Sequence, residues 1–282
     1  MTVFNTKKEV ETLVTSHKAT KKTIGFVPTM GALHKGHLSL IQNAFDENDI
    51  VFVSIFVNPT QFDNNADLDK YPRTLDADVK LIESISDDII VFAPSANEIY
   101  EQEITSKEYK FDGLEFEMEG KHRKGHFNGV GTILEILFKL VLPNKAYFGE
   151  KDFQQLQIVK KLTQKLKLDL DIVGCDIYRE DSGLAMSSRN ERLSLLARKE
   201  AAFIHKTLLA AKEKFGTKSA KEVTEWVTKQ FAKNKKFNLE YVEIANIDTL
   251  KTVKRKSKNK KYRIFIAAFI ENIRLIDNIA LN

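Results

Sequence analysis

A nearly uninterrupted apolar run, Asp49-Ile-Val-Phe-Val-Ser-Ile-Phe-Val-Asn58, places the strongest constraint on the fold of this chain. The run is rich in β-branched residues and lacks the alternation of apolar and polar residues that marks a strand with one face in water. Such a run indicates a parallel strand that is buried on both faces. Burial on both faces requires helices above and below the sheet, so the run predicts an α/β fold.

Further strands and helices alternate around this run. Strands are predicted over residues 23–28 and 88–93, and helices over residues 6–19, 36–46 and up to Ser84. This alternation favours a doubly wound parallel sheet with right-handed crossovers. Residues 100–128, where Glu and Lys alternate with aromatic residues, are expected to form edge strands or a loop excursion. The alternation then resumes. A helix is predicted over residues 132–142, a short strand from residue 146, a helix up to residue 167 and a strand over residues 170–178.

From residue 179 the pattern changes. Two amphipathic helices are expected over 194–215 and 219–233, followed by antiparallel strands over 239–247, 262–270 and 273–279. Helices followed by strands, without βαβ alternation, indicate a small α+β domain. We therefore predict a Rossmann-like doubly wound parallel sheet over residues 1–178 and a smaller α+β lid domain over residues 179–282.

Composition restricts the class of protein. The single cysteine, Cys175, excludes an intramolecular disulfide and fits a reducing compartment. The N-terminal residues contain no apolar segment of the signal-peptide kind, and the longest apolar run, residues 50–57, is far shorter than the ~20 residues of a membrane span. We therefore expect a cytoplasmic protein without a membrane partner.

Positive charge is concentrated near the C-terminus. The net charge of the chain is +5, and residues 197–282 contain 20 Lys and Arg against 9 Asp and Glu. The basic run Lys254-Arg-Lys-Ser-Lys-Asn-Lys-Lys261 lies between two predicted strands, which indicates an exposed hairpin loop. A solvated, lysine-rich surface is the simpler interpretation of this charge, and an RNA-binding module is the alternative.

The segment most informative about chemistry is Val27-Pro-Thr-Met-Gly-Ala-Leu-His-Lys-Gly-His-Leu-Ser-Leu40, which joins a predicted strand to a predicted helix. His34 and His37 share one face of the first helical turn if the helix begins between them. Unpaired N–H groups and the positive end of the helix dipole make such a junction a natural anion site. The added imidazoles suggest a polyphosphate that reacts there.

Three other polar clusters also follow a predicted strand or open a predicted helix, namely Asn58–Gln61, Gly149–Gln155 and Met186–Arg189. Ligands of open α/β sheets bind beyond the carboxyl ends of the strands, so the clusters can line one cleft. Lys151 would place a cation beside helix N–H groups, and Arg189 could supply a guanidinium to oxygens that gain charge. Gln61 and Gln155 suit the hydroxyls or carboxylate of a small substrate.

Several familiar sites are disfavoured. Zinc at His34 and His37 would need a third ligand at a recognisable spacing, and the H-E-x-x-H pattern is absent. His122 and His126 are candidates, but the cations Arg123 and Lys124 between them disfavour a metal ion there. The sequence also lacks a P-loop motif, a G-x-G-x-x-G motif at the first helix and a G-x-S-x-G elbow. Whether any residue binds a metal stays open. Phosphate-binding groups without a protein nucleophile suggest that the substrates supply the reacting atoms.

Six motifs in this sequence resemble those of the pantoate–β-alanine ligase (pantothenate synthetase) family, in the same order: residues 28–37, 56–62, 71–74, 125–130, 148–156 and 183–190. His34-Lys-Gly-His37 is similar to the His-x-Gly-His motif of the wider nucleotidyltransferase superfamily, and Met186-Ser-Ser-Arg189 is similar to its second loop. After Phe62 the sequence departs from the family pattern, which leaves the conformation of that loop open.

The resemblance implies a two-step reaction. The carboxylate of pantoate attacks the α-phosphate of ATP, giving pantoyl adenylate and pyrophosphate, and the amine of β-alanine then displaces AMP. It also implies Mg²⁺ bound through the ATP phosphates, a homodimer, and no nucleic-acid partner. The alternative enzyme is another nucleotidyltransferase, which would join AMP or CMP to a phosphate-bearing substrate.

Site residues follow from the resemblance by their motif positions. His37 would be the proton donor, and His34, Lys151 and Arg189 would assist catalysis. Pantoate and β-alanine would be held by Gln61 and Gln155, with Asn58 and Arg123 close by. The ATP site would comprise Met30, Gly31, Ala32, Leu33, His34, Lys35, Gly36, His37, Gly149, Glu150, Lys151, Asp152, Tyr178, Met186, Ser187, Ser188 and Arg189.

Overall fold

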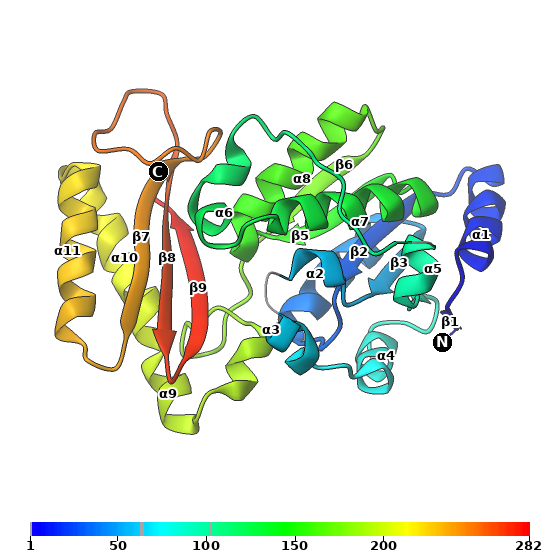
Figure 1. Cartoon of the computed structure of the whole chain (residues 1–282), viewed down its shortest axis with the longest axis horizontal. Coiled ribbons are helices and arrows are strands. Elements are labelled where there is room, and N and C mark those ends of the chain that lie inside the picture. Colours follow the sequence, from blue (N-terminus) through cyan, green and yellow to red (C-terminus); the bar gives the residue numbers. More distant parts are fainter. Residues whose placement is uncertain (1, 63–64, 102) are drawn as a thin grey trace. The chain divides into compact units, whose positions relative to one another are not determined.

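The computed structural model describes residues 2–62, 65–101 and 103–282. It divides into two compact units, Met1–Asp176 and Ile177–Asn282 (Figure 1). The sequence placed the boundary close by, after residue 178. Part of the loop that follows Phe62, whose conformation the sequence left open, lies outside the described residues.

The first unit is built on a six-stranded sheet with the order β1-β4-β3-β2-β5-β6. All neighbouring strands are parallel, which confirms the predicted sheet. Its strands are β1 (Val3–Phe4), β2 (Ile24–Thr29), β3 (Ile50–Ile55), β4 (Ile90–Phe92), β5 (Lys145–Gly149) and β6 (Asp171–Cys175). Strand β1, which the sequence analysis missed, pairs with β4 through only two residues and forms one edge.

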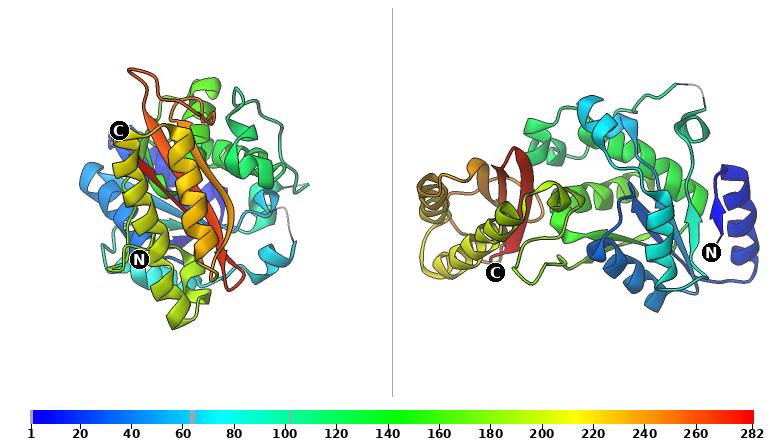
Figure 2. Two further views of the ribbon diagram at one scale, coloured as in Figure 1. Left: turned by 90° about the vertical axis from the view of Figure 1, so that its left-hand side faces the viewer. Right: turned by 90° about the horizontal axis from the view of Figure 1, so that it is seen from below.

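Helices cover both faces of this sheet (Figures 1 and 2). Successive residues of β2 point to opposite faces. Phe26 meets Phe138 edge to face, with ring centroids 6.2 Å apart, whereas Val27 joins Ile41 and Ile82 in a separate apolar core. The helices on the Phe26 side are α1 (Lys7–Ala19), α7 (His126–Val141) and α8 (Phe153–Leu166), and those on the Val27 side are α2 (Lys35–Glu47) and α4 (Leu75–Glu83).

Of the two alternatives predicted for residues 100–128, the loop excursion fits and the edge strands do not. Residues 103–111 have no regular secondary structure, short helices follow them, and α7 begins at His126 rather than at residue 132. Two glycines that resemble loop residues lie inside α7 because the packing leaves no space for a side chain. A Cβ atom at Gly129 would lie 2.2 Å from the carbonyl oxygen of Thr60. The remaining short helices of this unit are α3 (Asn65–Lys70), α5 (Ala96–Tyr100), η2 (Leu114–Phe116) and α6 (Met118–His122).

The second unit is an antiparallel sheet of three strands with helices on one face, as predicted (Figure 2). Its strands are β7 (Asn238–Asn246), β8 (Tyr262–Ile270) and β9 (Ile273–Ala280), and its helices are α9 (Leu195–Glu200), α10 (Ala202–Thr217) and α11 (Ala220–Lys233). The helix expected over residues 194–215 is therefore two helices. The basic run Lys254–Lys261 joins β7 to β8, which confirms the hairpin loop. Within the described ranges, no helix is long and apolar enough to cross a membrane.

A buried carboxylate fastens the segment before α7 to that helix. Glu135 accepts a hydrogen bond from the Tyr109 hydroxyl and forms ion pairs with Lys139 at 2.6 Å and Lys107 at 3.2 Å. Burial alone would raise the pKa of Glu135, but the hydrogen bonds from Lys139, Tyr109 and Lys107 outweigh it and lower the pKa from 4.5 to about 2. The folded state therefore favours the ionised form.

This network should stabilise the first unit at neutral pH and fail in acid. A Glu whose pKa is lower in the folded state adds stability above its unfolded pKa, and loses it as the pH falls through the folded value. We expect Glu135→Gln to lower the free energy of unfolding by about 2–4 kcal/mol at pH 7. The loss should shrink steadily as the pH falls from 4.5 toward 2.

Urea unfolding of both proteins between pH 7 and pH 3 measures this difference. The exposed Glu11 offers a matched control, since Glu11→Gln should leave the urea midpoint almost unchanged throughout. A Glu135→Gln penalty that is the same at pH 7 and pH 3 would contradict the assigned role of the charge.

Candidate active site

A strained turn carries the chain from β2 into α2. Gly31 and Ala32 have φ angles of +81° and +50°, both in the left-handed region, which is unfavourable for alanine. The carboxylate of Asp78, only 2% exposed, accepts hydrogen bonds from the N–H groups of Ala32 at 3.0 Å and Leu33 at 2.7 Å. Two N–H groups of the loop just before α2 are therefore already bonded to an internal carboxylate.

His34 and His37 lie together immediately beyond this turn, as their spacing predicted. His34 is the N-cap of α2, and its Nδ1 accepts a hydrogen bond from the Gly36 N–H at 3.1 Å. The proton of the neutral ring is therefore on Nε2, where it can be donated. His37 stacks on His34 with ring centroids 4.1 Å apart. Its Nδ1 is buried and has no hydrogen-bond partner among the described residues.

Both imidazoles are neutral at physiological pH. Burial, reinforced by the positive charge of Lys151, lowers the pKa of His34 from 6.5 to about 4. Burial, together with His34 and Lys151, lowers the pKa of His37 to about 3. Two imidazolium ions in this stack would repel each other strongly, so the neutral state is what allows the rings to pack.

Lys151 reaches the two histidines from the neighbouring strand. Strand β5 pairs with β2 and ends at Gly149, and the chain continues through η3 (Glu150–Asp152) into α8. The Nζ atom of Lys151 lies 3.4 Å from the carboxylate of Asp152, which occupies the N-cap of α8 without a side-chain capping bond. The crevice between β2 and β5 is where the strand order reverses, and such crevices bind ligands in open α/β sheets.

The turn after β3 presents Gln61. This turn consists of Asn58 and η1 (Pro59–Gln61). Asn58 is 1% exposed, and its side-chain nitrogen donates to the side-chain oxygen of Gln61 at 3.2 Å and to the carbonyl of Gly129 at 3.1 Å. The Tyr100 hydroxyl donates to the side-chain oxygen of Asn58. The amide nitrogen of Gln61 lies 2.9 Å from the Sδ atom of Met30. These contacts fix the orientation of Gln61.

Arg123 and His126 hold the same turn through its backbone. The Nη2 atom of Arg123 donates to the carbonyl of Gln61 at 3.3 Å, and Nδ1 of His126 lies 2.8 Å from that oxygen. Since a carbonyl only accepts, the His126 proton is on Nδ1, and its Nε2 accepts from Arg123 at 3.1 Å. Burial, together with Arg123, lowers the pKa of His126 to about 4. Both ring nitrogens are occupied, so His126 fixes the turn and has no nitrogen left for a metal ion.

Two adjacent glutamines in α8 have different environments. Gln154 is buried. Its side-chain NH₂ group donates to the carbonyls of Leu114 and Glu117, and its side-chain oxygen accepts from the N–H of Glu119. Gln155 is half-buried and makes none of these bonds. Gln154 therefore anchors the segment before α7, which leaves Gln155 as the member of the pair that a ligand can use.

The remaining predicted residues belong to the second unit. A short hairpin, closed by the Arg179–Ala185 bridge, precedes η4 (Ser188–Arg192), and the N–H of Met186 donates to the carbonyl of Tyr178 at 3.0 Å. Ser187 is the N-cap of η4, and its hydroxyl accepts from the N–H of Arg189 at 3.3 Å. The segment Met186–Arg189 is therefore an ordered turn with a capped start.

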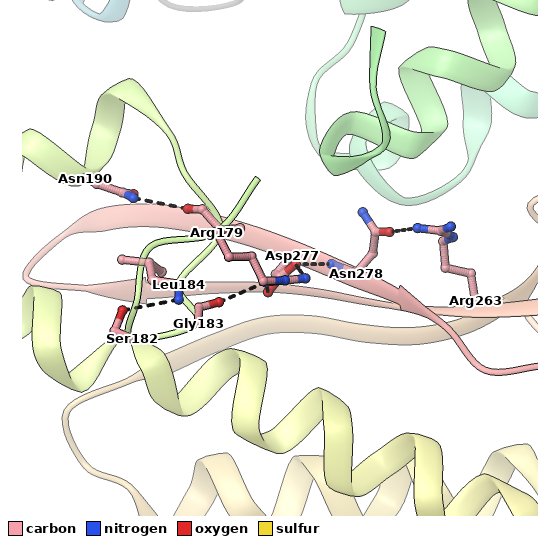
Figure 3. A network of polar contacts seen from close by, with 9 residues as sticks. Arg179, Ser182, Gly183, Leu184, Asn190, Arg263, Asp277 and Asn278 are labelled. Atoms are coloured by element: carbon pink, nitrogen blue, oxygen red, sulfur yellow. Dashed lines mark hydrogen bonds and ion pairs between the residues drawn. The ribbon is translucent and has the colours of Figure 1, made fainter. Parts of the chain in front are cut away.

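Buried polar contacts hold this hairpin in place (Figure 3). Arg179 makes a bidentate ion pair with Asp277 of β9, at 2.7 and 2.9 Å, and donates to the carbonyl of Gly183 at 3.0 Å. Asn190 is 1% exposed and donates to Glu180 at 2.8 Å and to the Ala185 carbonyl at 3.1 Å. Sequence reasoning assigned no role to these four polar side chains, although Asn190 ends one of the quoted motifs.

Metal ligands do not gather in the part of the chain that the structure describes. No group of three or more His, Cys, Asp or Glu side chains there is arranged to hold a metal ion. The arrangement instead offers neutral imidazoles, a lysine and amides at the ends of three neighbouring strands. These features define an α/β enzyme with a polar ligand site at the switch point of a parallel sheet.

Known proteins give this class a family. The model of the pantoate-beta-alanine ligase family matches residues 2–280. Pantothenate synthetases from Flavobacterium psychrophilum and Christiangramia forsetii are each 58% identical to this chain over its whole length and theirs. The crystal structure of pantothenate synthetase from Thermus thermophilus is 36% identical, with a TM-score of 0.91, and the match covers 100% of this chain and 99% of that one. The chain belongs to the pantoate–β-alanine ligase family.

Depressed pKa values of the stacked histidines make a direct prediction. In NMR titrations of protein with labelled histidines, His34 and His37 should stay neutral from pH 8 to pH 5.5, because their pKa values are about 4 and about 3. Lys151→Met should raise both pKa values, since it removes a positive neighbour. Lys35→Met, which removes an exposed cation next to His34 in the sequence, is the matched control and should change them less. A midpoint near 6.5 for either ring in the unmodified protein would refute this picture.

Proposed function

We propose that this chain condenses pantoate with β-alanine through a pantoyl-adenylate intermediate. As a member of the pantoate–β-alanine ligase family it is an ATP-dependent ligase that forms pantothenate. The observation that carries the proposed route is the stacked, neutral pair His34 and His37 beside Lys151 at the switch point. A structure from Francisella tularensis, 35% identical with a TM-score of 0.80 over 100% of this chain and 98% of that one, is described as a complex with β-γ ATP and β-alanine. That description supports ATP and β-alanine as ligands.

The phosphates of ATP would be met mainly by side chains. Asp78 already occupies the N–H groups of Ala32 and Leu33, so these donors are not available to a phosphate. His34 can donate from Nε2, and Lys151 supplies the charge. The residues assigned to ATP are Met30–His37 and Gly149–Asp152 in the first unit, and Tyr178 and Met186–Arg189 in the second.

In the first step, a carboxylate oxygen of pantoate attacks the α-phosphorus of ATP. A new P–O bond forms, the bond to the bridging oxygen breaks, and pyrophosphate leaves with the electron pair. Gln61 and Gln155 would hold pantoate, with Arg123 fixing the Gln61 turn. Catalysis of this kind depends on positioning and on stabilising the charge of the leaving oxygens, to which His37, Lys151 and Arg189 are assigned.

In the second step, the amine of β-alanine attacks the acyl carbon of pantoyl adenylate. The amide bond forms, the C–O bond to AMP breaks, and the nitrogen loses a proton.

Negative charge brought by ATP favours protonated imidazole, so bound nucleotide would raise the pKa values of His34 and His37. This change would let His37 act as a proton donor even though its free-enzyme pKa is about 3.

Mg²⁺ would reach the site with ATP. The described residues offer no cluster of acidic ligands, and both carboxylate oxygens of Asp78 are engaged by the protein. Magnesium usually keeps several waters and binds substrate phosphates with few protein ligands, which fits a nucleotide-borne ion. We also propose that the enzyme is a cytoplasmic homodimer that binds neither RNA nor membranes.

Isotope exchange tests this function. Labelled pyrophosphate should enter ATP only when pantoate is present, and added β-alanine should then release AMP. Exchange that ignores pantoate would point to another nucleotidyltransferase. Tight, salt-sensitive RNA binding without any exchange would favour the basic second unit as a binding module.

Three substitutions test the assigned groups. His37→Ala, Lys151→Ala and Arg189→Ala should each lower the pantoate-dependent exchange rate about 10²- to 10³-fold, because each removes a donor to charged oxygens, while circular dichroism stays unchanged. Lys165→Ala removes a cation from the other end of α8, next to Asp112, and should exchange normally. Near-normal exchange in any of the first three variants would remove that residue from the mechanism.

A further inference from the structure

Among the described residues, Asp78 is the buried carboxylate that bonds the turn leading to the histidines. It lies in the first turn of α4, and all three of its described hydrogen bonds come from groups that fix this turn or its own helix. Oδ1 accepts from the N–H of Leu33 at 2.7 Å, and Oδ2 accepts from the N–H of Ala32 at 3.0 Å and from the Thr74 hydroxyl at 3.2 Å. A buried carboxyl group requires such hydrogen bonds, and here the backbone supplies most of them.

The turn needs an external restraint. Two successive residues, Gly31 and Ala32, have positive φ, and the alanine costs roughly 1–2 kcal/mol in that conformation. The hydrogen bond from its N–H group to Asp78 offsets part of this cost. The same carboxylate also holds the next N–H, that of Leu33, and His34 follows directly as the N-cap of α2.

We propose that Asp78 is a positioning residue for the stacked pair His34 and His37. Its two oxygens keep the Ala32 and Leu33 peptides in the left-handed turn, and the turn determines where α2 begins and where both imidazoles stand. It also fills the two backbone donors, so a polyphosphate meets imidazole and ammonium groups instead. This inference rests on the proposed function for its catalytic consequence, but its structural part does not.

Asp78→Asn is the decisive variant because it keeps the shape of the side chain. One oxygen becomes an NH₂ group that faces a backbone N–H, so at least one of the two bonds is lost. We expect NMR signals of the His34 and His37 rings to shift in the free enzyme, while those of His126 stay in place. The pantoate-dependent exchange rate should fall 10- to 100-fold, in line with the cost of small misplacements, and the KM for pantoate should change less than twofold.

Asp76→Asn is the matched control. Asp76 is an exposed acid in the same first turn of α4, so its substitution removes the same charge from the helix end without touching the turn. Its exchange rate and histidine signals should match those of the unmodified enzyme. If Asp78→Asn does not fold, Thr74→Val removes only the third donor and should give smaller shifts of the same two rings.

Unmoved His34 and His37 signals in a folded Asp78→Asn protein would overturn the proposal, whatever its activity. Unchanged exchange would overturn the catalytic part. A failure of the proposed function looks different. In that case the unmodified enzyme shows no pantoate-dependent exchange, and the shifts caused by Asp78→Asn in the free enzyme remain.

Discussion

Strand β2 hydrogen-bonds with β3 on one side and with β5 on the other, so the order of strands reverses at this point of the sheet. The positions of His34, His37 and Lys151 relative to one another depend on that pairing. At such a point the chain segments that leave the two strands lead to helices on opposite faces of the sheet, and ligands of open α/β sheets bind there. The histidines come from the end of β2 and Lys151 comes from the end of β5. Lys151 thereby lowers the pKa values of His34 and His37, which lie more than one hundred positions earlier in the chain.

Neutrality, rather than charge, distinguishes the histidine pair. A neutral imidazole can take up a proton when negative charge arrives beside it. Burial suppresses protonation in the free enzyme, and Lys151 strengthens this effect. The internal carboxylate of Asp78 occupies two backbone N–H groups, those of Ala32 and Leu33, in the loop that leads into α2. In the proposed function, the nucleotide meets side chains whose charge state its own negative charge can alter.

The sequence was sufficient for the sheet and for the face shared by His34 and His37, because both follow from local periodicity. It was insufficient where contacts join distant segments. Asp78 lies 45 positions beyond Leu33, and nothing in the sequence distinguishes it from the exposed Asp76 in the same turn. The start of α7 was missed because Gly129 suggests a loop, whereas the close backbone of Thr60 requires a glycine there. The sequence argued against a metal at His126, but it could not show that this ring bonds the Gln61 carbonyl, 65 positions away.

The ion pair between Arg179 and Asp277 links the first residues of the second unit to its last strand. This link imposes an order of events on biosynthesis. Chains emerge from the ribosome at ~5–20 residues per second, so the first unit is free to fold while the hairpin before η4 still lacks its anchor. On the order of ten seconds separates Arg189 from Asp277 at these rates. A chain interrupted before β9 would carry the histidine pair, but the hairpin that leads into η4 would lack its ion-pair partner in the last strand.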